Sequence, residues 1–226
     1  MSSIVLSPGA TGAAAFTIEA PSTATSRVIT LPDATDTLVG KATTDTLTNK
    51  TLVAPALGTP ASGDLTNCTN KVISGTAQAS TSGTSIDFTG LPSGVKRVTV
   101  MFNNVSPSGT AALLLQLGDS GGFETSGYAG SADARVSNSP AAMSSGFILQ
   151  PEMFAGSTYA GTAIVTLENS NAFTWTCLAI VSRSDGTSTV GYGSGVKSLT
   201  ATLNSVRITL SSGSFDAGEI NILYES

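Results

Sequence analysis

Large apolar side chains stand at every second position in several stretches of the chain that follow Val72. This spacing is typical of β-strands that bury one side, because successive side chains of a strand point to opposite sides. Turns rich in Pro, Ser and Gly separate the stretches. The pattern predicts an all-β fold, an antiparallel β-sandwich of jelly-roll-like type, without amphipathic helices. The predicted strands include Val98–Phe102, Leu113–Leu117, Phe173–Val181, Val206–Leu210 and Ile220–Tyr224.

The longest alternating row, Phe173–Val181, has an unusual second side. One side carries Trp175 and Cys177, which we expect in the core of the sandwich. The other side begins with threonines and ends with Leu178 and Ile180. This strand is therefore expected to become apolar on both sides towards its C-terminal end.

Residues 1–70 have a different composition from the rest of the chain. Phe16 is their single aromatic residue, and more than half of them are Ser, Thr, Ala or Gly. Short aliphatic runs such as Val28–Leu31 hold too little side chain to build a private core, but they can pack against neighbouring copies. We therefore predict an extended attachment or stalk segment over 1–70, a β-sandwich tip domain over 71–226, and a homo-oligomer. A flexible linker is the alternative for the first segment.

Charge and hydropathy exclude several classes of function. Charged residues make up 11% of the chain, against about a quarter in ordinary soluble proteins. The net charge is -5 and the largest basic cluster is the pair Lys96–Arg97, so we expect no nucleic-acid binding. No apolar run approaches the ~20 residues that span a bilayer, so we expect no membrane insertion. Synthesis in a cytoplasm predicts that Cys68 and Cys177 are free thiols.

Two motifs suggest enzyme chemistry, and both lack a required part. Gly118–Gly122 reads GDSGG, which matches the G-x-S-x-G pattern around a nucleophilic serine. That chemistry needs a base beside Ser120, normally a histidine, and the chain has none. Gly191–Ser198 resembles a phosphate-binding loop, but Val196 separates the last glycine from the lysine. We therefore predict a turn at the first motif and a hairpin loop at the second.

No catalytic, cofactor or metal site is predicted. Histidine is absent and the acidic residues are scattered, so no set of metal ligands is apparent. Tyr128, Tyr159 and Tyr192 each lie in a Gly-rich stretch, which predicts exposed loops. Exposed aromatic rings offer an apolar face and a polar tip. These three tyrosines are therefore candidate contacts for a glycan on a host surface.

One block of the N-terminal segment resembles a known family. Residues 27–66 contain TLPDATDTLVG followed by TTDTLTNKTL. This block is similar to segments of bacteriophage tail-fibre and related virion proteins. The later runs SGTSIDFTGLPSGVKRVTVMF and LLLQLGDSGGFETSGY are similar to a β domain attached to such segments. Many tail fibres are several times longer than this chain.

The resemblance implies a structural subunit of a phage virion, made in the host cytoplasm and carrying no catalytic residues. It implies a homotrimer whose residues 1–70 contact other virion proteins and whose β-rich tip points outward. A tail fibre is the first expectation. A head fibre, a capsid decoration protein, a glycan-binding receptor module and a depolymerase are the alternatives.

Overall fold

The computed structural model describes residues 51, 71–134, 140–187 and 189–226. The chain divides into two units, 1–61 and 62–226. The predicted attachment segment, residues 1–70, lies outside the described residues apart from Thr51, and so does Cys68. The residues that are described form strands and turns without helix, which confirms the all-β prediction.

The strands form two antiparallel sheets, as the alternating pattern predicted. The smaller sheet has the order β3-β13-β5-β6, with β9 also paired to β5. The larger sheet has the order β1-β14-β4-β10-β11-β12-β7-β8, with β2 also paired to β14. The smaller sheet consists of β3 (Ser85–Thr89), β5 (Ala111–Asp119), β6 (Gly122–Phe123), β9 (Phe147–Met153) and β13 (Ser205–Leu210). The larger sheet consists of β1 (Val72–Ser74), β2 (Gln78–Ala79), β4 (Arg97–Pro107), β7 (Ala129–Ala134), β8 (Ala141–Ala142), β10 (Tyr159–Asn169), β11 (Thr174–Arg183), β12 (Val190–Ser198) and β14 (Phe215–Glu225).

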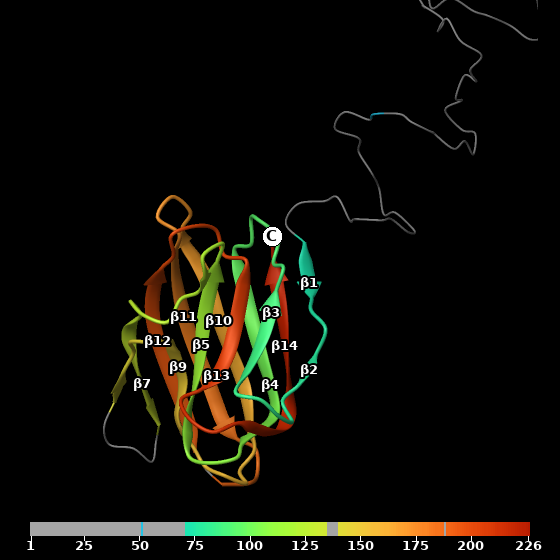
Figure 1. Ribbon diagram of the computed structural model, residues 1–226, viewed down its shortest axis with the longest axis vertical. Coiled ribbons are helices and arrows are strands. Elements are labelled where there is room, and N and C mark those ends of the chain that lie inside the picture. The colour runs from blue at the N-terminus through green and yellow to red at the C-terminus, as the bar shows by residue number, and fades with distance from the viewer. Residues whose placement is uncertain (1–50, 52–70, 135–139, 188) are drawn as a thin grey trace, which may run out of the picture. The chain divides into compact units, whose positions relative to one another are not determined.

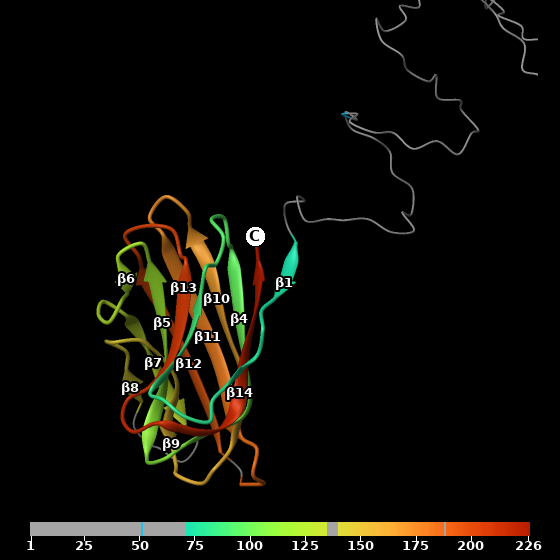
Figure 2. The same cartoon turned by 45° about the vertical axis from the view of Figure 1, so that its right-hand side comes forward.

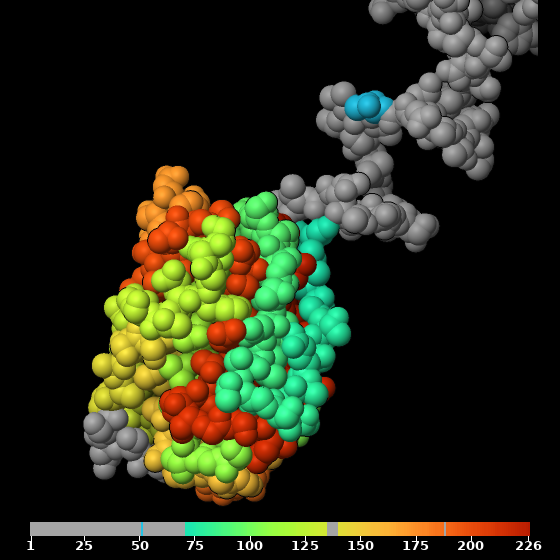
Figure 3. Space-filling model, in the orientation of Figure 1, coloured from blue at the N-terminus to red at the C-terminus, as the bar shows by residue number. Residues whose placement is uncertain are grey.

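The two sheets face each other as the layers of a sandwich (Figures 1 and 2). Between β2 and β14 the chain passes repeatedly from one sheet to the other: at β2–β3, β3–β4, β4–β5, β6–β7, β8–β9, β9–β10, β12–β13 and β13–β14. Figure 3 shows the side on which the teal strand β3 lies next to the red β13 region, its hydrogen-bonded neighbour. Each layer therefore turns one side to the core and the other side to the surroundings.

The core follows the alternation of the sequence. Val98 and Val100 from the larger sheet face Leu113 and Leu115 from the smaller one, and all four side chains are fully buried. Trp175 is also buried, as expected. Each such side chain contributes about 1.5–3 kcal/mol when it leaves water. The five predicted strands are present in β4, β5, β11, β13 and β14, except that Phe173 lies in the turn before β11.

The prediction of a hairpin loop at Gly191–Ser198 was wrong, because this segment is strand β12. Its glycines at every second position lie on the inner side, where β9 packs against the strand. A Cβ atom added to Gly193 would lie well under 3.0 Å from the backbone oxygen of Ile148. A Cβ atom on Gly191 would meet the buried amide of Gln150 in the same way. The glycines therefore serve close packing rather than phosphate binding.

We predict that Gly193→Ala lowers the free energy of unfolding by about 1–3 kcal/mol, as overpacked cores do. The physical reason is that backbone atoms of β9, which cannot rotate away, occupy the place of the new methyl group. Gly109→Ala is the matched control, because a Cβ atom there meets nothing within 4 Å. Urea unfolding of the full-length variants measures the effect. Equal midpoints for the two variants would contradict this account of β12.

Candidate functional site

The outer side of the larger sheet carries an exposed apolar surface. Seven large apolar side chains remain exposed among the described residues, and six of them lie on β10, β11 or β12. Leu178 is 56% exposed, Ile180 55% and Tyr192 52%. We call this set the β10–β12 face; it consists of Ile164, Leu178, Ile180, Val190, Tyr192 and Val196.

Strand pairing brings these side chains together. Ile164 on β10 is directly opposite Leu178 on β11, and Ile180 on β11 is directly opposite Tyr192 on β12. Residues paired in this way have Cβ atoms about 4.5–5.5 Å apart. The side chains therefore form one continuous surface rather than isolated exposed residues.

Charge is confined to the margins of this surface. Along β11 and β12, every outward side chain is Thr, Ser, Tyr or aliphatic. On one side, beyond β10, Arg97 and Glu225 form an ion pair between β4 and β14. On the other side, Asp133 of β7 is directly opposite Tyr192. The surface thus has an uncharged centre and a polar rim, the arrangement typical of protein interfaces.

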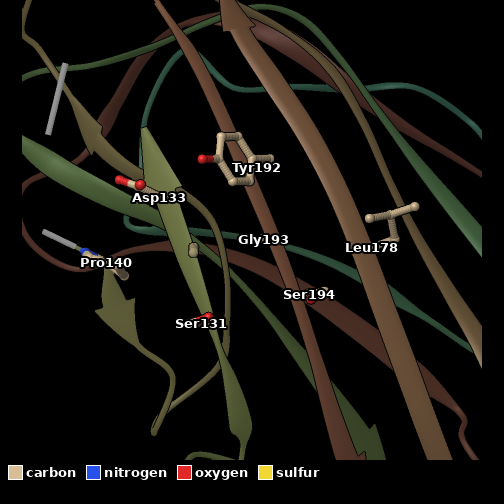
Figure 4. A pocket seen from close by; sticks show the side chains of 8 residues that line it. Ser131, Asp133, Pro140, Leu178, Tyr192, Gly193 and Ser194 are labelled. Carbon is tan, nitrogen blue, oxygen red and sulfur yellow. The ribbon is translucent and has the colours of Figure 1, made fainter. Parts of the chain in front are cut away.

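An open recess of about 300 Å³ lies at one margin of the β10–β12 face. Figure 4 shows Tyr192 projecting from β12, Leu178 from β11 and Asp133 from β7 around it. Hydroxyl groups of Ser131 and Ser194 complete the polar part of its wall. An aromatic ring, a carboxylate and hydroxyl groups can bind a polyhydroxylated ligand, and the apolar wall can receive an aliphatic side chain.

Of the three tyrosines predicted to be exposed, Tyr192 alone is exposed, although it lies in a strand rather than a loop. Tyr159 is fully buried at the start of β10, where its hydroxyl accepts a hydrogen bond of 2.9 Å from the Phe154 N–H. Burial raises the pKa of Tyr159. Tyr128 is also buried and packs edge-on against Phe147, with ring centroids 4.9 Å apart. The predicted exposure was wrong for both residues, because their rings fill the core; Tyr128 does lie in a loop, between β6 and β7, whereas Tyr159 begins a strand.

Tyr128 connects three parts of the fold. Its hydroxyl accepts a hydrogen bond of 2.8 Å from the Leu117 N–H and donates one of 3.1 Å to the Glu124 carbonyl. The Lys197 ammonium lies 5.4 Å from the centre of the Tyr128 ring and 2.9 Å from a Glu124 carboxylate oxygen. Burial raises the pKa of Tyr128, so the phenol stays neutral. The residue is therefore structural.

The GDSGG motif also has a structural use. Ser120 is exposed in the turn after β5, as predicted, whereas Asp119 is buried. One Asp119 carboxylate oxygen accepts from the Gly121 N–H at 2.8 Å. The other accepts from the Thr200 N–H at 3.0 Å, the Thr200 hydroxyl at 2.7 Å and the Ala201 N–H at 3.0 Å. The motif thus anchors the connection between β12 and β13 through its aspartate.

Titratable groups elsewhere do not gather into a site. Within the described ranges, no three His, Cys, Asp or Glu side chains are grouped so that they could hold a metal ion. Cys177 is a free, buried thiol, and burial raises its pKa to about 12. The described part of the chain contains no helix that is long and apolar enough to cross a membrane.

Comparison with known proteins yields no relative: no family model, no curated protein and no solved structure matches the chain. The function has to be inferred from the residues of this chain. Among the described residues, the β10–β12 face with its recess is the strongest candidate for a functional surface.

We predict that Tyr128→Phe lowers the free energy of unfolding by about 1–3 kcal/mol, the cost of leaving a buried donor without its partner. The donor concerned is the Leu117 N–H. Tyr192→Phe removes the same hydroxyl from an exposed ring and serves as the control. Chemical denaturation of both variants checks the expectation, which fails if the two changes have the same effect.

We also predict that Asp119 makes folding dependent on pH in the acid range. Burial by itself would raise the pKa of Asp119, but its hydrogen bonds to Thr200, Gly121 and Ala201 outweigh that effect and lower it. A carboxylate with a lowered pKa in the folded state stabilises the protein above its unfolded pKa of about 3.9. This contribution is lost as the pH falls through the folded pKa.

Unfolding curves recorded between about pH 2 and pH 6 measure this effect, a range that spans the unfolded pKa of an aspartate. Asp119→Asn should reduce stability at pH 6 and flatten the loss of stability below about pH 4. Ser120→Ala, in the adjoining exposed turn, should change stability by less than about 1 kcal/mol. Parallel pH profiles for the wild type and Asp119→Asn would show that the carboxylate has no such role.

Proposed function

We propose that this chain is a structural subunit of a bacteriophage particle, a tail-fibre or related appendage protein that acts as a homo-oligomer and not as an enzyme. The observation that carries the proposal is the β10–β12 face. Monomeric soluble proteins rarely leave large contiguous apolar surfaces exposed, and such surfaces with polar rims mark protein interaction sites. In an assembly, a neighbouring subunit covers such a surface and removes its apolar side chains from water.

The use of the enzyme-like motifs supports the same proposal. In GDSGG, Asp119 holds a neighbouring connection and leaves Ser120 in an exposed turn. The glycines of β12 leave room for the close packing of β9 and do not form a phosphate-binding loop. With no histidine in the chain, the usual base for a serine nucleophile is missing. Structural roles therefore account for both motifs without catalysis.

The resemblance of residues 27–66 to virion fibre segments supports the location. On this proposal, residues 1–70 attach the subunit to other virion proteins and contribute to a homotrimer. Residues 71–226 form the tip. A head fibre or a capsid decoration protein would place the same architecture elsewhere on the particle. The proposal requires no cofactor.

Electron microscopy of intact particles labelled with an antibody against residues 71–226 tests the proposal. We expect label at an appendage, with the same number of sites on every particle. A preimmune antibody is the control for adventitious adsorption. Absence of the protein from purified particles, although it is present in the lysate of infected cells, would refute the proposed function.

The recess beside Tyr192 favours a second candidate function, the binding of a glycan. Its ring, the Asp133 carboxylate and the hydroxyls of Ser131 and Ser194 are the groups that a sugar would contact. A glycan array probed with the full-length protein tests this function. Binding that is lost in Tyr192→Ala but kept in Tyr192→Phe would support it, because phenylalanine keeps the aromatic face. An array without signal would exclude it for the glycans represented.

A further inference from the structure

We propose that the β10–β12 face binds the same face of a second copy of this chain, so that tip domains contact each other directly. This inference rests on the proposal that the protein works as an assembled subunit. It adds the surface, the partner and the side chains that meet. Because a two-fold contact cannot join all three copies of one homotrimer, it concerns a contact between tip domains of different assemblies, separate from any made by residues 1–70.

Charge favours a second copy over a charged partner. The chain carries a net charge of -5, so two copies repel each other unless they meet where charge is lowest. The centre of the β10–β12 face is such a place, because the outward residues of β11 and β12 are uncharged. A nucleic acid or an anionic surface would find no counter-charge there. An identical face needs no counter-charge, because its own centre is uncharged.

The outer side of the smaller sheet provides the contrast. There Arg207 forms two hydrogen bonds of 2.7 Å with Asp87 and lies 4.1 Å from the centre of the Phe123 ring. Both charged side chains are about one third exposed. The charged side chains on that side are therefore already paired with each other, whereas the β10–β12 face leaves apolar side chains in water. The gain from covering a surface is larger on the β10–β12 face.

The shape of the face is suited to pairing with itself. A two-fold interface uses one patch twice, so the patch must contain both a protrusion and a matching hollow. We assign the role of the protrusion to Ile180, which is 55% exposed on β11 near the middle of the sheet. The recess bounded by Tyr192 and Leu178 is the hollow, one strand away. In a two-fold pair, Ile180 of each copy would enter the recess of the other.

The size of the face is sufficient for a specific contact. Strands β10, β11 and β12 have 11, 10 and 9 residues. With a rise of about 3.3 Å per residue and a strand spacing of about 4.8 Å, these three strands cover roughly 480 Å², and the rim strands β4 and β7 extend the area to roughly 750 Å². Standard interfaces bury about 800 Å² per partner. We therefore expect reversible association, with affinity set by the few apolar side chains at the centre.

Sedimentation velocity on the full-length protein, from about 1 to 100 µM, tests this inference over the range where interfaces of modest affinity dissociate. Ile180→Lys places a charge at the centre of the face, at an exposed position where the fold tolerates it. We expect this variant to weaken association at least about tenfold, a difference of about 1.4 kcal/mol. Thr89→Lys, on an exposed position of β3 in the smaller sheet, is the control and should associate like the wild type.

A second measurement locates the contact even if residues 1–70 hold the copies together in every variant. Tyr192 is half exposed in a single copy, whereas Tyr128 and Tyr159 are buried. Nitration by tetranitromethane should therefore be slower at Tyr192 in the associated wild type than in Ile180→Lys. Equal association and equal Tyr192 nitration in the wild type, Ile180→Lys and Thr89→Lys would overturn the inference.

The outcomes also separate this inference from the proposed function. Self-association through the face, in a protein that is absent from purified particles, would refute the virion function and leave the pairing intact. Sugar binding abolished by Tyr192→Ala, with no effect of Ile180→Lys on mass or nitration, would assign the recess to a glycan and refute the pairing.

Discussion

Burial of one side of strand β11 is the constraint on which the rest of this structure depends. Trp175, Cys177 and Ala179 lie between the two sheets and are almost fully buried. Because neighbouring side chains of a strand point to opposite sides, burying these residues forces Leu178 and Ile180 outward. A shift of one residue would exchange the two sets. The exposed apolar face is therefore a direct consequence of how the core is filled.

The small residues of β12 and β7 are part of the same arrangement. Gly191, Gly193 and Gly195 leave room on the inner side, and β9 packs into that space. The outward positions between them carry Tyr192 and Ser194, which line the recess. Close packing on the inside and a hollow on the outside thus occur at the same strand. The surface that we assign to assembly therefore lies on the outer side of strands whose inner side packs closely against β9.

Buried polar groups join the ends of the sheets. Asp119 holds the connection between β12 and β13 with three hydrogen bonds and its own turn with a fourth. Tyr128 links β5 to the segment after β6, and Lys197 pairs with Glu124 beside it. Such groups stabilise a fold because a buried donor or acceptor without a partner is costly. The sequence motifs that resemble enzyme signatures are used for this purpose.

The sequence by itself determined the fold class, the five strands with an apolar residue at every second position and the exclusion of a histidine base. These are local properties, since the spacing of apolar residues sets which side of a strand is buried. It also indicated that the β11 row becomes apolar on both sides at Leu178 and Ile180. The tertiary structure alone decided that β12 is a strand, that Tyr128 and Tyr159 are buried, and that Asp119 rather than Ser120 carries the structural role of GDSGG. Each of these depends on atoms from a distant segment, such as Ile148 against Gly193 or Thr200 against Asp119, and the order of residues does not reveal which segments meet.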